Sequence, residues 1–401
     1  MKKFLFWTAL ASVALTGCVK NDVEPNPSLG QETEITFNAP IVRKVTKAGP
    51  VTGPLGAGYS TSENFVVSAW SHTDVFTAAT DINPYFNQVI ANPTSATEDG
   101  NPYVTEDDGT LHYTWLLATK YYWPKTHRLT FSAFSPAELI DGTIIEGTSD
   151  KYADGATTTL EDGITLTNVN IPTDINKHYD ILYSDRVYNQ KERVYNFDVA
   201  NNNYFGVDIP FIHALSSVNV KAKWAIDYNY GDPLGKNKIV ITDIRFENVC
   251  FQASSFTENV GGNRALVNSA NKNHATWNNP TNPQSISIES DPANELKLTT
   301  AEETFGIPAL LIPQPLANTH GNVKLVVDYT ITNASGNSLD ESIKFDLSTV
   351  DFTTGGVTPY TWEIGKKYTY VLTFSLNEIH LAPYVQNWDD VDAEFDSDDL
   401  I

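Results

Sequence analysis

The chain has 401 residues and a formal net charge of −23 at pH 7, from 26 basic and 49 acidic residues. A surface this acidic repels phosphate backbones and anionic headgroups, which argues against a protein that binds nucleic acid. With 41% hydrophobic and 11% aromatic residues the chain can build sizeable cores, and its length suggests about two domains on a prior of roughly 150 residues each.

The start of the chain has the pattern of an exported lipoprotein. A basic start precedes an apolar run over residues 4–15, which is shorter than the ~20 residues that cross a bilayer as a helix. The run closes in the sequence LTGC, which resembles a bacterial lipobox, where the cysteine is acylated. We therefore expect residues 1–17 to be a signal peptide and Cys18 to carry lipid. The alternative is an ordinary signal peptide followed by a chance cysteine.

A polar tether and a series of β-strands follow. Residues 18–33 are polar and contain two prolines, which predicts a flexible tether. Beyond it apolar residues alternate with polar ones, the period of a β-strand, beginning with Ile35 and Phe37. Further strands are predicted at residues 64–70, 128–134, 180–184, 207–224, 238–246, 285–288, 309–312, 323–331 and 368–376.

This pattern predicts an all-β protein. Residues 111–123 come closest to a helical pattern, but their Tyr, Trp and Thr residues favour a strand, and Pro124 ends either element. Many short strands separated by turn residues are typical of β-sandwiches. Three asparagines at 201–203 interrupt two strand-rich halves. We therefore predict two tandem β-sandwich domains, residues 34–203 and 204–401.

The sequence carries no motif of a known catalytic or nucleotide-binding site, which predicts a protein that is not an enzyme and needs no cofactor or metal. A glycoside hydrolase would need two converging carboxylates, and no pair stands out. His213, in the apolar segment PFIHAL, is interpreted as a histidine hydrogen-bonded in the core. Cys250 has no disulfide partner if Cys18 is lipidated, and is interpreted as a small buried hydrophobe. The acidic residues 105–109 are interpreted as a solvated turn rather than a calcium loop.

The aromatic cluster of Tyr121, Tyr122 and Trp123 leaves two interpretations open. Aromatic faces suit carbohydrate rings, so the cluster would serve a monomeric, lipid-anchored glycan-binding surface protein. Such clusters more often pack beneath a sheet or close the end of a sandwich, and we favour that interpretation.

Seven segments form a series along the chain: residues 34–48 (EITFNAPIVRKVTKA), 121–136 (YYWPKTHRLTFSAFSP), 180–184 (DILYS), 210–218 (PFIHALSSV), 310–316 (LLIPQPL), 362–370 (WEIGKKYTY) and 385–388 (VQNW). In content and order they resemble the fimbrillin family of Bacteroidetes, which comprises FimA/Mfa-like pilus subunits and related surface lipoproteins. The resemblance spans nearly the whole mature chain.

The resemblance implies two transthyretin-like β-sandwich domains and the function of a structural subunit of a cell-surface fimbria, or pilus, that contributes to adhesion. It also implies export to the outer membrane as a lipoprotein, cleavage near the N-terminus by an arginine-specific protease, and polymerisation with other fimbrillin subunits by donor-strand exchange. In such an exchange an open sheet edge gains main-chain hydrogen bonds from an incoming strand.

The resemblance places the protease site near Arg43, the first arginine of the chain. Cleavage after it would free residues 18–43, with the lipid, and leave Lys44 as the new N-terminus. The alternative is an arginine that is merely exposed in a loop.

A candidate donor strand lies near the C-terminus. Val391, Ala393 and Phe395 alternate with acidic residues, which predicts a strand with one apolar face. The alternative is an acidic edge strand or a loose tail.

Overall fold

The computed structural model shows an all-β chain, which confirms the predicted fold class. The structure describes residues 33–38, 64–73, 75, 82–93, 115–140, 152–159, 163–184, 186–192, 206–209, 211–225, 238–258, 275–288, 296–297, 300–332, 335–350, 360–374 and 379–387. In these ranges the helical elements are short 3-10 turns: η1 (Ala137–Leu139), η2 (Ile175–Lys177) and η3 (Leu347–Thr349). None of the described helices is long and apolar enough to span a membrane.

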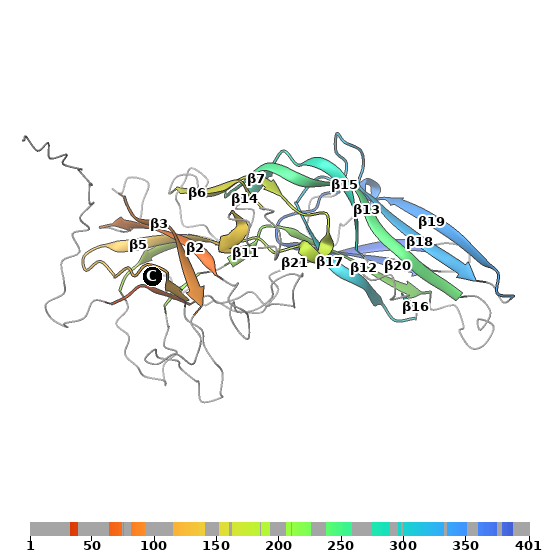
Figure 1. The fold of residues 1–401 in the computed structure, drawn as a ribbon, viewed down its shortest axis with the longest axis horizontal. Helices are drawn as coiled ribbons and strands as arrows, with labels where there is room; N and C mark the ends of the chain where they lie inside the picture. The colour runs from red at the N-terminus through yellow and green to blue at the C-terminus, as the bar shows by residue number, and fades with distance from the viewer. Residues whose placement is uncertain are drawn as a thin grey trace, which may run out of the picture.

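The first sheet lies at one end of an elongated molecule (Figure 1). Its strand order is β10-β1-β4-β3-β2-β5-β8-β11, with β9 beside β5. The central strands β2 and β5 are buried along almost their whole length, and their runs of apolar and small residues suit a position covered on both faces. The strands are β1 (Thr36–Asn38), β2 (Phe65–His72), β3 (Asn83–Pro93), β4 (Trp115–Leu117), β5 (Arg128–Ser135), β8 (Leu182–Ser184), β9 (Val187–Gln190), β10 (Val207–Asp208) and β11 (Phe211–His213).

Two further sheets occupy the rest of the molecule (Figure 1). The second sheet has the order β17-β12-β20-β21, and its strands are β12 (Ser216–Trp224), β17 (Glu303–Leu311), β20 (Lys366–Phe374) and β21 (Ile379–Asn387). The third has the order β19-β18-β13-β7-β6, with β14, β15 and β16 also paired to β13. Its strands are β6 (Gly155–Thr159), β7 (Gly163–Asn170), β13 (Lys238–Glu258), β14 (Ala275–Asn278), β15 (Thr281–Ser287), β16 (Leu296–Lys297), β18 (Lys324–Thr332) and β19 (Ser338–Asp346).

The described residues form two main apolar cores. The larger one is shared by the second and third sheets, and it also takes in Val66, Phe134 and Tyr183 of the first sheet. In this core β12 buries every second residue from Val218 to Trp224. In the same core the Trp362 indole donates to the Tyr370 hydroxyl at 3.0 Å, so the polar atoms of two large rings satisfy each other. The first sheet buries a separate, aromatic-rich core around Phe65 and Phe131.

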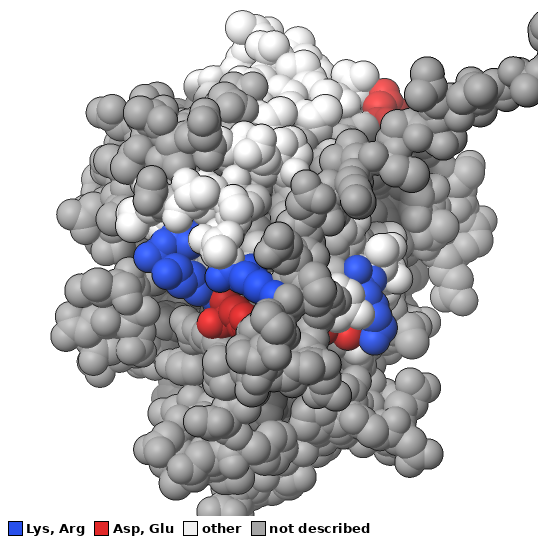
Figure 2. Space-filling model, turned by 90° about the vertical axis from the view of Figure 1, so that its left-hand side faces the viewer, with Lys and Arg blue, Asp and Glu red and all other residues white. Residues whose placement is uncertain are grey.

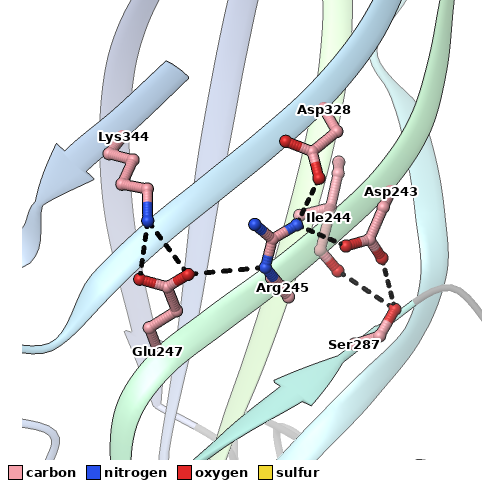
Figure 3. A network of polar contacts seen from close by, with 7 residues as sticks. All are labelled: Asp243, Ile244, Arg245, Glu247, Ser287, Asp328 and Lys344. Atoms are coloured by element: carbon pink, nitrogen blue, oxygen red, sulfur yellow. Dashed lines mark hydrogen bonds and ion pairs between the residues drawn. The ribbon is translucent and has the colours of Figure 1, made fainter. Parts of the chain in front are cut away.

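A network of charges crosses one side of the third sheet (Figure 3). The Arg245 guanidinium donates to Asp243 at 2.7 Å and to Asp328 of β18, and its Nε lies 3.5 Å from Glu247. Lys344 of the edge strand β19 contacts the same Glu247 at 3.1 Å. Charged side chains of this kind on an edge strand discourage uncontrolled pairing with other chains.

The strands pair across the predicted domain boundary between residues 203 and 204. Strand β7 precedes it but pairs with β13 of the third sheet, while β10 and β11 follow it but pair with β1 and β8 of the first sheet. The sheets are thus built from strands on both sides of residue 203. The division into domains at residues 34–203 and 204–401 stays a prediction.

The predicted strands are present with changed lengths. The long strand predicted at 207–224 is three strands, β10, β11 and β12, and the one predicted at 238–246 extends to Glu258 as β13. The segment with the most helical pattern contains the short strand β4, as its residue types favoured. Strands such as β3, β7 and β19 were not predicted from the sequence.

Candidate functional site: the slot that holds the first strand

Strand β1 lies inside the first sheet, between β4 and β10, and we call this position the β1 slot. It pairs antiparallel with β4, where Phe37 lies opposite Trp115, and parallel with β10, where Phe37 lies opposite Val207. The pairing extends before β1, since the Ile35 N–H donates to the Tyr121 carbonyl at 2.8 Å. Strand β1 is thus hydrogen-bonded to a neighbouring strand on each of its two edges.

The apolar residues of this segment are completely buried. Ile35 and Phe37 have no exposed surface, and the Phe37 ring packs edge-on against Phe65 at 5.7 Å and Phe131 at 5.4 Å between ring centroids. Burying each such side chain stabilises the fold by about 1.5–3 kcal/mol. The β1 slot therefore holds its strand through side-chain pockets as well as main-chain hydrogen bonds.

Gly206 sets how closely β10 approaches β1. A Cβ atom at this position would lie 2.6 Å from the Thr36 carbonyl oxygen and 2.7 Å from the Phe37 nitrogen, both backbone atoms. Backbone atoms cannot move aside as the end of a flexible side chain can, so only glycine allows this contact. No local pattern marks Gly206 in the sequence, because its neighbour is more than 160 positions earlier in the chain.

Polar contacts hold the beginning of the segment. The Lys120 ammonium donates to the Glu34 carboxylate at 3.0 Å, and this hydrogen bond raises the pKa of Lys120. The Thr33 hydroxyl donates to Glu192, just after β9. The main-chain N–H of Trp123 donates to the Thr33 carbonyl at 3.0 Å. The segment is thus bound at its start by loops from two distant parts of the chain.

The residues predicted to act in export and assembly lie outside the described residues. They are Cys18, Arg43, Lys44, Val391, Ala393 and Phe395, and the acidic turn 105–109 lies outside as well. Two described elements flank them: β1 ends at Asn38, shortly before Arg43, and β21 ends at Asn387, shortly before Val391. Their roles stay predictions.

Trp123 and Tyr121 of the aromatic cluster pack against other aromatic rings, which is the interpretation that we favoured from the sequence. Trp123 is buried, with its ring 6.0 Å from that of Phe131 in an edge-on arrangement. Tyr121 packs against Phe86 with ring centroids 4.6 Å apart. Since Trp123 offers no open face to solvent, it is not available to stack on a sugar.

The two core interpretations from the sequence are confirmed. The His213 Nδ1–H donates to the buried Asp180 carboxylate at 2.6 Å, which links β11 to the segment before β8. Cys250 is buried with a free thiol, and burial raises the pKa of that thiol. Across the described residues, no group of three or more His, Cys, Asp or Glu side chains is arranged to hold a metal ion.

Comparison with known proteins places the chain in a family. A search of the curated proteins finds no match. Among solved structures, the chain is similar to a fimbrial protein from Bacteroides vulgatus, at 18% identity over 88% of this chain and 99% of that one, with a TM-score of 0.49. It is also similar to the tip fimbrial protein Mfa3 from Porphyromonas gingivalis, at 10% identity over 89% of this chain and 100% of that one, with a TM-score of 0.35. The model of the fimbrillin-like family matches residues 57–388, and the chain therefore belongs to that family.

Proposed function

We propose that this protein is a structural subunit of a cell-surface fimbria, in which a strand from another subunit replaces β1 during assembly. The observation that carries the proposal is the placement of β1, which is buried and paired on both edges although the first arginine of the chain follows it closely. Membership of the fimbrillin-like family supports the same role.

Cleavage after Arg43 would turn β1 from a covalently tethered strand into a bound peptide. While the chain is intact, the tether keeps β1 at a high effective concentration next to its slot, so that it rebinds at once after any opening. A cut removes that advantage, and β1 then competes with other strands as a separate molecule. Its departure would leave β4 and β10 with unpaired main-chain groups and expose the pocket of Phe37, a combination that favours capture of a new strand.

The slot defines what a replacement strand must offer. It needs apolar side chains two positions apart to take the places of Ile35 and Phe37, and polar residues between them. The C-terminal sequence Asp392-Ala393-Glu394-Phe395 has this alternation, with Phe395 corresponding to Phe37. We therefore propose the strand containing Val391, Ala393 and Phe395 as the donor to a neighbouring subunit.

The lipid on Cys18 would serve transport in this scheme. Acylation would hold the unprocessed chain at the outer membrane, where an arginine-specific protease would cleave it. Because the cut after Arg43 discards residues 18–43, the lipid would leave together with β1. The proposed partners are thus the protease, the membrane before processing, and other fimbrillin subunits afterwards.

N-terminal sequencing of surface filaments tests the proposal. Filaments of the unchanged chain should start at Lys44, and Arg43→Ala should abolish both this start and the filaments. Lys44→Ala is the matched control, because it removes the same charge next to the bond but keeps the arginine, so it should still be cut at position 43. A mature start at Cys18 in all surface material, with no polymer after treatment with an arginine-specific protease, would contradict the proposal.

A further inference from the structure

Figure 2 shows basic residues on the end of the molecule that holds the first sheet, with acidic residues beside them. Lys120 binds Glu34 at the start of the β1 segment, and Lys125 lies in the same loop. Arg128 opens β5 and donates to the Asn189 carbonyl of β9 at 3.3 Å, while Lys191 directly follows β9. We call these four residues, Lys120, Lys125, Arg128 and Lys191, the basic end.

The basic end is poorly neutralised, although the chain as a whole carries a net charge of −23. Among the described residues, Lys125, Arg128 and Lys191 have no carboxylate partner. The acids beside this end in the described chain are Glu34, which binds Lys120, and Glu192, which accepts from Thr33. Lys125 and Lys191 are also exposed, so these two cations at one end of an acidic molecule are available to an external anionic group.

Loss of β1 would make this end more basic. Four bases and two acids give a local charge of +2, and removal of the segment that contains Glu34 leaves four bases and one acid, or +3. Lys120 would lose its carboxylate partner in the same step. The opening of the β1 slot and the strengthening of the positive charge beside it are thus one event.

The chain itself contains a segment of matching charge. Residues 389–399 hold seven Asp or Glu residues and no Lys or Arg. In this segment Asp392 stands in the same relation to Phe395 as Glu34 stands to Phe37, three positions before it. A strand that placed Phe395 in the pocket of Phe37, running in the same direction, would bring Asp392 to the place where Glu34 now meets Lys120.

We propose that the basic end is an electrostatic docking site for the acidic C-terminal segment, residues 388–401, of a second copy of this chain. The choice of this occupant rests on the donor role proposed above. Long-range attraction would bring the segment to the mouth of the β1 slot before any strand pairing forms. Such steering raises association rates by roughly 10- to 1,000-fold and weakens as salt is added.

A fluorescent peptide of residues 388–401 tests the proposal, added to the full chain before and after cleavage at Arg43. Reversing two charges with Lys125→Glu and Lys191→Glu should lower the association rate constant about tenfold at low salt, with little change in the dissociation rate. Lys177→Glu in η2 is the control, since it reverses a lysine that is not part of the basic end. The difference between the variants should shrink at high salt, and a peptide with its acidic residues changed to Asn should not distinguish them.

The outcomes separate docking from strand exchange. Binding of the peptide that is equally fast to the Lys125→Glu/Lys191→Glu variant and to the unchanged chain overturns the docking site and leaves the fimbrial function intact. Absence of peptide binding to the cut chain, while filaments still form, overturns it as well. Peptide binding to the uncut chain that depends on Lys125 and Lys191 supports the docking site, even if cleavage yields no filament and the proposed function fails.

Discussion

Gly206 lies so close to Thr36 that a Cβ atom at position 206 would be 2.6 Å from the Thr36 carbonyl oxygen. The contact joins the residue just before the two-residue strand β10, at one edge of the first sheet, to the strand that precedes Arg43. Because the crowding involves backbone on both sides, the size of one residue governs how firmly the β1 slot closes on its strand.

Gly206→Ala should therefore loosen β1 within the slot. The added methyl group forces the two backbones apart, at a cost of about 1–3 kcal/mol. Hydrogen exchange at residues 33–38 should become faster, and after cleavage at Arg43 the fragment should leave sooner than in the unchanged chain. Gly155→Ala is the control, because the Cβ there would meet only Thr167 Oγ1 at 3.4 Å, an ordinary contact. Unchanged exchange at residues 33–38 in Gly206→Ala would show that this contact does not hold β1.

Phe395→Asp should prevent filament assembly after cleavage. A carboxylate in the apolar pocket that holds Phe37 has no compensating partner among Phe65 and Phe131, and burying it costs several kcal/mol. Ser397→Asp adds the same charge two residues later and should leave assembly intact. Electron microscopy of the cut proteins distinguishes the two variants. Normal filaments from Phe395→Asp would remove Phe395 from the donor role.

The sequence predicted strand β1 itself but not the two strands that pair with it in the slot. The alternation of Ile35 and Phe37 is a short-range pattern, and it predicted β1 correctly because period two depends only on neighbouring residues. The strands on either side, which carry Trp115 and Val207, come from distant parts of the chain, and no periodicity encodes which strands pair. The same limit hid Gly206, whose importance lies entirely in a non-local contact.

The two buried histidines show the same difference between what the sequence reveals and what it does not. His213 was interpreted correctly because it interrupts an apolar run, where a polar group must find a partner. His178 gave no such signal, since its neighbours Lys177 and Tyr179 are only half-buried and its partner Leu310 is 132 positions away. Prediction succeeded where the burial of a residue was visible in its neighbours.

His178 should make the fold sensitive to acid. Its Nε2–H donates to the Pro172 carbonyl at 2.7 Å and its Nδ1 accepts from the Leu310 N–H at 3.0 Å, an arrangement that requires the neutral ring. Burial lowers the pKa of His178 from 6.5 to about 4. Between these values the unfolded chain binds more protons than the folded one, so stability is full above pH 6.5 and falls as the pH drops towards 4, by about 2–4 kcal/mol in total.

Urea unfolding at several pH values measures this contribution. His178→Gln lowers stability at every pH. The decisive quantity is the slope of the free energy of unfolding against pH between pH 6.5 and 4, which should become shallower because the titration of His178 no longer contributes to it. His320→Gln changes an exposed histidine and should keep the slope of the unchanged chain. An identical slope in His178→Gln would show that another group causes the acid sensitivity.

Breaking the buried pair of Arg186 and Glu258 should lower the stability of the fold far more than breaking an exposed pair. Arg186 follows β8 and donates to the Thr159 carbonyl at 3.1 Å, and its Nε lies 4.0 Å from Glu258, whose other oxygen accepts from the Ile164 N–H at 3.0 Å. The side chains of the pair are only 2% and 6% exposed. These contacts join the first sheet to the end of β13.

Arg186→Met should destabilise the fold by about 3–5 kcal/mol, because it removes one partner of a buried pair of opposite charges. Adding Glu258→Gln should recover much of that loss, since it removes the buried negative charge that Arg186 faces. Lys344→Met, which breaks the exposed contact with Glu247, is the control and should cost about 0–1 kcal/mol. Chemical denaturation of the single and double variants gives the coupling energy. A coupling near zero between Arg186 and Glu258 would mean that their 4.0 Å separation is too long for a working ion pair, and that the Thr159 contact alone holds the arginine.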